Sequence, residues 1–190
     1  MPLRSTPMRS ALAFIGALLG VASWVAARKL VVRKGESLPF EIALPAEAQI
    51  ESKPGLLSAR IGELTVVAIA KDLMEDQSTP VPERKNLSRR ILTSMIMGSD
   101  AVLFALLDEE LTRRKLELGS VVREIGLLGG KRAACVRGRF EDGGAGGWID
   151  MQATVKDGIM YMLAFTVPGG GPEPHQALVK GIHGSVFLPW

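Results

Sequence analysis

The chain has 190 residues; setting aside about 35 for an apolar head and its basic flank leaves roughly 155, enough for one domain with a sizeable core. The net charge is only +3, and the excess bases lie beside the apolar head, so the remaining part is close to neutral and does not indicate a nucleic-acid-binding protein. A single cysteine, Cys135, excludes an internal disulfide and leaves the redox compartment open.

Residues 10–27 (SALAFIGALLGVASWVAA) form the one long uncharged stretch. A bilayer core takes about 20 helical residues, and roughly 17 suffice, so a transmembrane helix is predicted between a basic tail (1–9) and a basic linker (28–37). The run exceeds the roughly 7–15 residues of a usual signal core, which favours an uncleaved signal-anchor. Two alternatives stay open: cleavage near Ala27, which would release an exported soluble protein, and an organellar presequence.

Strand-like and helix-like stretches alternate over the remaining domain, 38–190. Alternating polarity over 40–45 predicts a half-buried strand that ends at a proline. Residues 64–70 (LTVVAIA) are β-branched and apolar on both faces, as in an interior strand. The polar stretch 76–85, with two prolines, is typical of an exposed loop.

Two helices are predicted next. Asn86 is a suitable N-cap for a helix over 86–98. Gly98-Ser99-Asp100 interrupts this helix and offers a fresh cap for a second one. The acidic residues 108–110 of the second helix are expected to face water, and the cations 113–115 lie near its C-terminus, where the helix dipole favours them. The inward face of this second helix consists of leucines, Leu103, Leu106, Leu107 and Leu111.

The C-terminal half predicts mainly strands. Residues 119–128 and 131–140 read as two strands joined by a glycine turn, and 141–147 (EDGGAGG) reads as a loop. A strand over 148–155, with one apolar phase, is followed by the hairpin signal Asp157-Gly158, because glycine accepts the positive φ that such a turn requires.

The last two elements are a central strand and a helix. Residues 159–166 are apolar in both phases, which predicts a strand covered on both faces. After a flexible stretch, Val179, Ile182 and Val186 recur at helical spacing, with Pro174 at the first helical position. The whole predicts an α+β domain with a mostly antiparallel sheet of about five or six strands and helices packed on its faces.

Several stretches carry a resemblance to a known fold: FEIALP (40–45), LTVVAIA (64–70), LLGGKRAACVRGRF (127–140), GIMYMLAFTVP (158–168) and GSVF (184–187). Together they resemble the PsbP-like fold, which includes the photosystem extrinsic PsbP proteins and DcrB-type bacterial envelope proteins. The resemblance implies a binding role rather than catalysis, and a domain on the extracytoplasmic (periplasmic) side. The flanking charges slightly favour the cytoplasmic side instead.

Gly129-Gly130-Lys131 resembles part of a phosphate-binding loop. A phosphate loop requires an earlier glycine and a serine or threonine after the lysine, but Ile125 and Arg132 stand at those positions. A tight turn between two strands is the better interpretation.

Cys135 with His175 or His183 could form a nucleophile and base. Activation requires an imidazole within hydrogen-bond reach and a lowered thiol pKa. Cys135 lies in an apolar strand, where a small buried hydrophobe is the usual role, so an envelope thiol enzyme is kept only as the alternative function. Glu173 with the two histidines is too loose a set for zinc, and no metal, cofactor or catalytic residue is predicted.

The sequence therefore predicts a membrane-anchored, non-catalytic binding or assembly module. Its partners would be the bilayer, through residues 10–27, and an unidentified protein or a small apolar ligand, without nucleic acid. Five methionines of the domain are expected to fill the core, and they also hint at a groove between the sheet and the helix over 86–98. They are Met95, Met97, Met151, Met160 and Met162.

Overall fold

A computed structural model describes residues 30–34, 40–73, 100–142, 145–156 and 159–188. The predicted transmembrane helix (10–27), the predicted helix over 86–98 and the Asp157-Gly158 turn lie outside these residues. Among the described helices, none combines the length and the apolar character needed to cross a bilayer.

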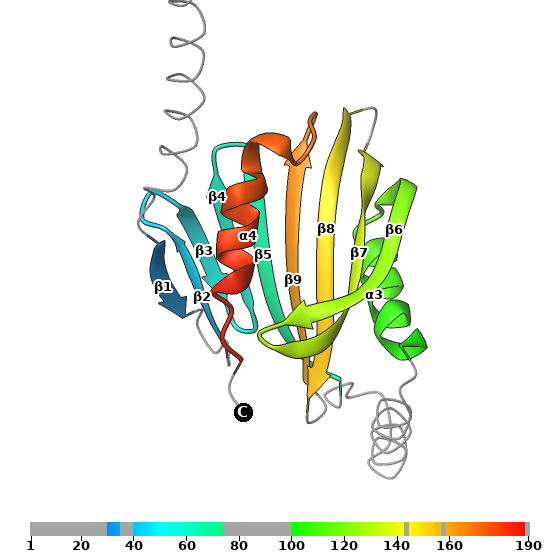
Figure 1. Cartoon of the computed structure of the whole chain (residues 1–190), viewed down its shortest axis with the longest axis horizontal. Coiled ribbons are helices and arrows are strands. Elements are labelled where there is room, and N and C mark those ends of the chain that lie inside the picture. The colour runs from blue at the N-terminus through cyan, green and yellow to red at the C-terminus, as the bar shows by residue number, and fades with distance from the viewer. Residues whose placement is uncertain (1–29, 35–39, 74–99, 143–144, 157–158, 189–190) are drawn as a thin grey trace, which may run out of the picture.

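The main element is a seven-stranded antiparallel sheet in the order β3-β4-β5-β9-β8-β7-β6 (Figure 1). A separate two-stranded sheet pairs β1 with β2. The strand bounds are β1 Leu30–Lys34, β2 Glu41–Pro45, β3 Gln49–Lys53, β4 Leu56–Ile61, β5 Leu64–Asp72, β6 Glu117–Leu128, β7 Lys131–Asp142, β8 Ala145–Lys156 and β9 Ile159–Pro168.

The expected count of five or six strands was too low, because β1, β3 and β4 were not predicted. β1 lies inside the stretch assigned to the linker, 28–37, and its pairing with β2 is a long-range feature that no local pattern signals. β3 (QIESK) is mostly exposed and charged, so it lacks the apolar alternation by which a strand is recognised.

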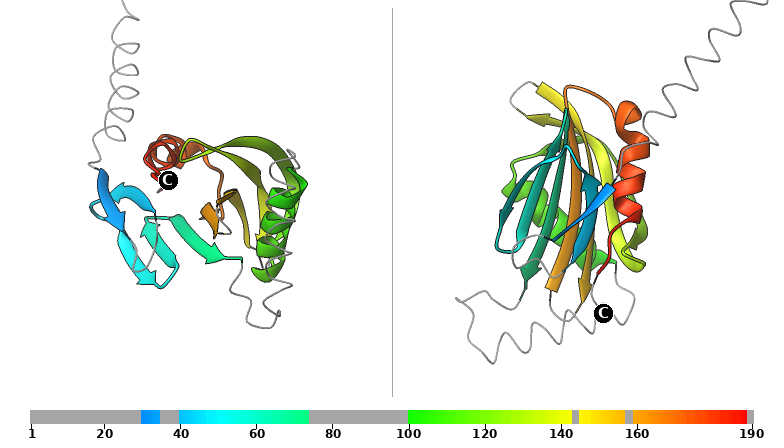
Figure 2. Two further views of the ribbon diagram at one scale, coloured as in Figure 1. Left: turned by 90° about the horizontal axis from the view of Figure 1, so that it is seen from below. Right: turned by 90° about the vertical axis from the view of Figure 1, so that its left-hand side faces the viewer.

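The central strand β9 lies between β5 and β8, and its two phases enter two separate cores, as predicted. One face of the sheet packs against α4 (Gln176–Gly184) and the two-stranded sheet, through residues such as Leu163, Phe165 and Ile182. The other face packs against α3 (Ala101–Arg113), through residues such as Leu107 and Met162. Figure 2 shows the two helices on opposite faces of the curled sheet.

The structure differs from the prediction near β8 in one boundary and in the burial of one phase of the strand. The glycine-rich stretch 141–147 is not simply a loop, because β7 and β8 remain paired as far as Asp142 and Ala145. β8 was expected to be half-buried, yet Asp150, Gln152 and Thr154 on its polar phase are buried as well. Burial of this polar phase determines where the candidate site lies.

The C-terminal segment consists of a short 3₁₀ turn, helix α4 and a stretch that pairs with β2. Pro174 belongs to a short 3₁₀ turn, η1 (Glu173–His175), rather than to the first position of α4, and Val186 follows the helix instead of lying on it. Phe187 then forms a β-bridge with Glu41. The helix prediction over this region is otherwise confirmed.

Candidate functional site

The sheet face that carries α4 changes character from one side to the other. On β5 and β9 it is apolar, and α4 covers it. Across the register, Leu163 of β9 lies opposite Gln152, and Phe165 lies opposite Asp150. Because side chains alternate along a strand, these polar residues of β8 share the α4 face with the apolar ones of β9. The polar part of this face, on β8, β7 and β6, is the candidate site.

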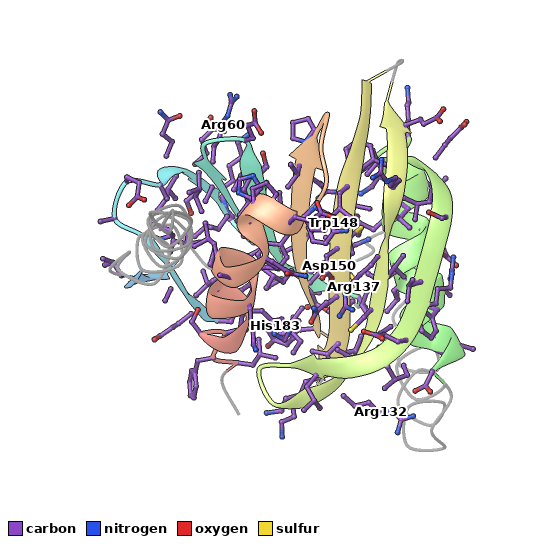
Figure 3. All side chains as sticks on the ribbon, turned by 45° about the horizontal axis from the view of Figure 1, so that its top comes forward. Arg60, Arg132, Arg137, Trp148, Asp150 and His183 are labelled. Carbon is purple, nitrogen blue, oxygen red and sulfur yellow. The ribbon has the colours of Figure 1, made fainter. Side chains whose placement is uncertain are left out.

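Five side chains form a chain of contacts there, which we call the polar network: Glu124 of β6, Arg137 of β7, Asp150 and Gln152 of β8, and His183 of α4. Figure 3 labels Arg137, Asp150 and His183 among them. Arg137 donates from Nε to Asp150 at 2.9 Å and pairs with Glu124 at 2.8 Å. Gln152 donates to Asp150 at 3.5 Å, and its Oε1 accepts from His183 Nε2 at 2.5 Å. The network thus links edge strand β6 to helix α4.

The network becomes more exposed from its centre to β6. Asp150 and Gln152 are each only 5% exposed, whereas the side chains of Arg137 and Glu124 are 40% and 45% exposed. Burial raises the pKa of the Asp150 carboxyl, although Arg137, Gln152 and His183 act in the opposite direction. A buried carboxylate held by a guanidinium is suited to fixing neighbouring elements in place, since removing either partner leaves an uncompensated charge.

Cys135 lies beside this network, opposite Gln152 in the strand register. Burial, followed by the negative charge of Asp150, raises the pKa of the Cys135 thiol to about 11. The hydrogen bond of His183 Nε2 goes to Gln152, and the Cys135 thiol donates to the carbonyl oxygen of Ala133 at 3.9 Å. The geometry therefore supports the buried-hydrophobe interpretation of Cys135 and gives a thiolate mechanism no support.

The histidines and the nearby acid do not converge. His175 and Glu173 lie in η1, before α4, whereas His183 lies in the last turn of that helix. Within the part of the chain that the structure describes, no three residues among histidine, cysteine, aspartate and glutamate are grouped so as to hold a metal ion.

The acidic stretch on α3 differs from the expectation of a solvated face. Glu110 is buried, and its carboxylate accepts hydrogen bonds from Arg113 and Arg114 at distances of 2.6–2.8 Å. Asp108 binds Arg123 of β6, and only Glu109 is largely exposed. The helical period places Glu110 beside Leu107 and Leu111 on the inward face, where the two arginines compensate its charge.

The predicted cap of α3 is only partly realised. Asp100 occupies the N-cap position, but its side chain makes no capping bond. Its carboxylate instead accepts two hydrogen bonds from Arg132 of β7, at 2.9 and 3.0 Å. The residue therefore ties the start of α3 to the start of β7.

A second candidate feature is the outer edge of the sheet at β6. Five large hydrophobic side chains of the described residues are exposed, and four of them lie on this one strand: Val121, Val122, Ile125 and Leu127. The fifth is Phe187. β6 pairs only with β7 among the described strands, so its other side ends the sheet. We call this strand side, with its four exposed residues, the β6 edge.

The apolar groove predicted beside the helix over 86–98 lies outside the described residues. Met151, Met160 and Met162 are buried in the core under α3, which confirms their role as core filling, while Met95 and Met97 lie outside the described residues. A half-open hollow of about 290 Å³ lies elsewhere, between Glu47, Gln49, Arg60 and Gly62. Its lining is polar, unlike the apolar pockets that hold small apolar ligands.

The polar network was missed at the sequence level because its residues are scattered over three strands and a helix. Asp150, Gln152 and Thr154 alternate with apolar residues, a pattern that usually indicates a solvent-facing phase. The one available signal was the strongly apolar neighbouring strand, 159–166, which made β8 an interior strand as well.

Comparison with known proteins identifies the fold. No protein-family model matches the sequence, and no curated protein matches it. Among solved structures, cyanobacterial PsbP from Synechocystis is 10% identical with a TM-score of 0.50, covering 85% of this chain and 94% of that chain. The Ran-binding protein Mog1p of Saccharomyces cerevisiae is 6% identical with a TM-score of 0.49, covering 85% and 96%.

A protein of Bacteroides thetaiotaomicron is 12% identical with a TM-score of 0.44, over 80% of this chain and 46% of that one, so this chain spans less than half of that relative. At such low identity the likeness to cyanobacterial PsbP concerns the fold alone. It confirms the resemblance seen in the sequence: the chain has a PsbP-like fold.

Proposed function

We propose that this protein is a non-catalytic binding module that works beside a membrane by contact with another protein. The observation that carries the proposal is the concentration of exposed hydrophobic side chains on the β6 edge. Exposed apolar groups that gather in one place mark interaction sites, whereas scattered ones need no explanation. The polar network ties this strand to β7 and β8 through Glu124, Arg137 and Asp150, and to α4 through Gln152 and His183.

A protein partner is favoured over a small apolar ligand, because the exposed apolar groups lie along an edge and not in a cavity. The raised pKa of Cys135 and the hydrogen bond of His183 to Gln152 weigh against the alternative of a thiol enzyme. Residues 10–27 would hold the module at the bilayer and raise the local concentration of partners, which lets a weak contact suffice. By its resemblance to envelope proteins, we place the domain on the extracytoplasmic side.

The proposal is tested by chemical crosslinking in native membranes, with the full chain carrying an affinity tag. The variant Leu127→Lys places a charge on the β6 edge, and it should reduce capture of the partner by about 10-fold, since a desolvated charge costs more than 1.4 kcal/mol. Its matched control is Phe187→Lys, because both side chains are 59% exposed and only Leu127 lies on β6.

Equal capture by the wild type and by Leu127→Lys would contradict the proposed contact surface. Recovery of the intact chain from a carbonate wash without lipid would contradict the membrane attachment. Both variants are compared by circular dichroism and thermal unfolding first, so that loss of folding is not read as loss of binding.

A further inference from the structure

We infer that the β6 edge binds its partner by strand addition: an extended, uncharged apolar segment of the partner protein pairs with β6 as an eighth strand. The inference rests on the proposed function and names the chemistry of the partner. Strand addition supplies affinity through main-chain hydrogen bonds and specificity through alternate side chains. Three features of β6 support it.

The first feature is the length of regular edge. The register with β7 is irregular between Leu118 and Val121 and then continues without a break from Val121 to Leu128. All four exposed hydrophobic residues fall within this regular part. Val121, Ile125 and Leu127 lie on one face of the strand and Val122 on the other, since neighbouring residues alternate. An added strand would therefore find apolar side chains on both faces.

The second feature is the way in which the strand's own charges are held. Arg123 donates to Asp108 of α3 at 2.7 and 3.1 Å and lies over the ring of Phe104. Glu124 pairs with Arg137 of β7 at 2.8 Å. Both charged side chains in the regular part of β6 are thus bonded to their own domain. The edge presents mainly neutral apolar groups, and a neutral apolar segment complements it best.

The third feature is the contrast with the opposite edge of the same sheet. Natural proteins protect edge strands by keeping them short and by placing charges or proline on them. β3 has five residues, includes Glu51 and Lys53, and is followed by Pro54. β6 has twelve residues and no proline, and the two charged side chains of its regular part, Arg123 and Glu124, are bonded to other side chains of the domain. Selective exposure of one edge is expected if that edge has a binding partner.

A second copy of this chain is a poorer occupant than a different protein. In an antiparallel pair related by a two-fold axis, one residue faces its own copy. In the two registers of greatest overlap, Glu124 would face Glu124 of the second copy or Arg123 would face Leu127. The first register places like charges opposite each other, which destabilises a strand pair, and the second places a charged side chain opposite an apolar one. A neutral apolar segment avoids both arrangements. The partner is therefore inferred to be a separate protein with an extended apolar segment.

The test is site-specific photo-crosslinking of the full chain in its native membrane. A photoreactive aromatic residue replaces Val121, Ile125 or Leu127 in turn, and mass spectrometry locates the labelled residue of the partner. Because opposing residues of paired strands advance in step, moving the probe from Ile125 to Leu127 should shift the label by roughly two residues. Moving it from Val121 to Ile125 should shift the label by roughly four in the same direction. The control probe replaces Gln49 on β3.

The outcomes separate a failure of the strand-addition inference from a failure of the proposed function. A labelled partner whose residues advance in register supports strand addition. A partner labelled without register, or equally from Gln49, overturns strand addition and leaves the binding function standing. Labels on β6 of a second copy, or on residues 74–99 of the same chain, overturn the inferred occupant. Absence of any labelled protein overturns both the inference and the proposed function.

Discussion

His183 on α4 donates a hydrogen bond from Nε2 to Oε1 of Gln152 on β8, across 31 residues of sequence. Gln152 in turn donates to Asp150, which also accepts from Arg137. Each member of the series therefore orients the next, and the position of α4 is joined to that of the sheet by polar contacts as well as by its apolar face. A buried polar network that is only partly hydrogen-bonded lowers stability, so removing one member should weaken the contribution of the others.

The first prediction concerns this contact. His183→Ala and Gln152→Ala should each lower the free energy of unfolding by about 1–3 kcal/mol, because each leaves a buried polar partner unsatisfied. The double variant should lose less than the sum of the two, as expected for coupled neighbours. Chemical denaturation measures all three. His175→Ala, at the half-buried end of the otherwise exposed 3₁₀ turn η1, is the control and should cost less than about 0.5 kcal/mol. Strict additivity would contradict the coupling.

The second prediction concerns pH. The folded-state pKa of Asp150 is raised above its unfolded value of about 3.9, so the folded state holds this proton more tightly than the unfolded state. The contribution of this group to stability is then fully present below pH 4 and is lost as pH rises through the folded pKa. Wild-type stability relative to Asp150→Asn should therefore decline between pH 4 and pH 7. A rise over the same interval, measured by denaturation at several pH values, would refute the assignment.

The third prediction concerns Glu110. Its side chain is 6% exposed and receives bonds from Arg113 and Arg114, so Glu110→Ala should lower the free energy of unfolding by about 1–3 kcal/mol. The neighbouring Glu109 is 66% exposed and pairs with Lys71 at 3.7 Å. Glu109→Ala should therefore change stability by less than about 0.5 kcal/mol. Thermal unfolding of the two variants checks the difference. Similar losses of stability would show that the burial of Glu110 does not determine its contribution.

The fold could be predicted where local patterns and burial agree. The central strand β9 is apolar in both phases and lies between two cores, and the leucine spacing of α3 fits the helical period. The α+β class and the antiparallel sheet followed from such segments. β3 could not be predicted in this way, because it is mostly exposed and its pairing with β4 supplies what its pattern lacks.

The candidate site could not be predicted from the sequence. Membership of the polar network depends on register, which sets Arg137 opposite Asp150 and Cys135 opposite Gln152. A shift by one residue would turn these side chains to the other face. The β6 edge was missed for a related reason, since the stretch 119–128 was recognised as a strand but nothing in its pattern indicates that it ends the sheet. The fate of Cys135 as a buried apolar group was predicted correctly, because its immediate neighbours are apolar.

The last prediction concerns the turn between β6 and β7, where Gly129 and Gly130 both have positive φ, 56° and 77°. Any other residue is strained in this region, so Gly130→Ala, whose new methyl group would meet no atom within 4 Å, should cost about 1 kcal/mol. A methyl group on Gly129 would lie 2.7 Å from Leu188 Cγ as well. Gly129→Ala should therefore cost about 2–4 kcal/mol, since overpacking adds to the backbone term.

The two causes can be separated by a further variant. Leu188→Ala removes the atoms that the new methyl group would meet, so Gly129→Ala should be less costly in that background by about 1–2 kcal/mol, whereas the cost of Gly130→Ala should not change. Chemical denaturation of the three single variants, the two double variants and the wild type gives both differences. If Gly129→Ala costs the same in both backgrounds, the hairpin turn does not depend on its contact with the C-terminal segment. If the cost falls as expected, the chain's last described residues help to hold the β6 edge in place.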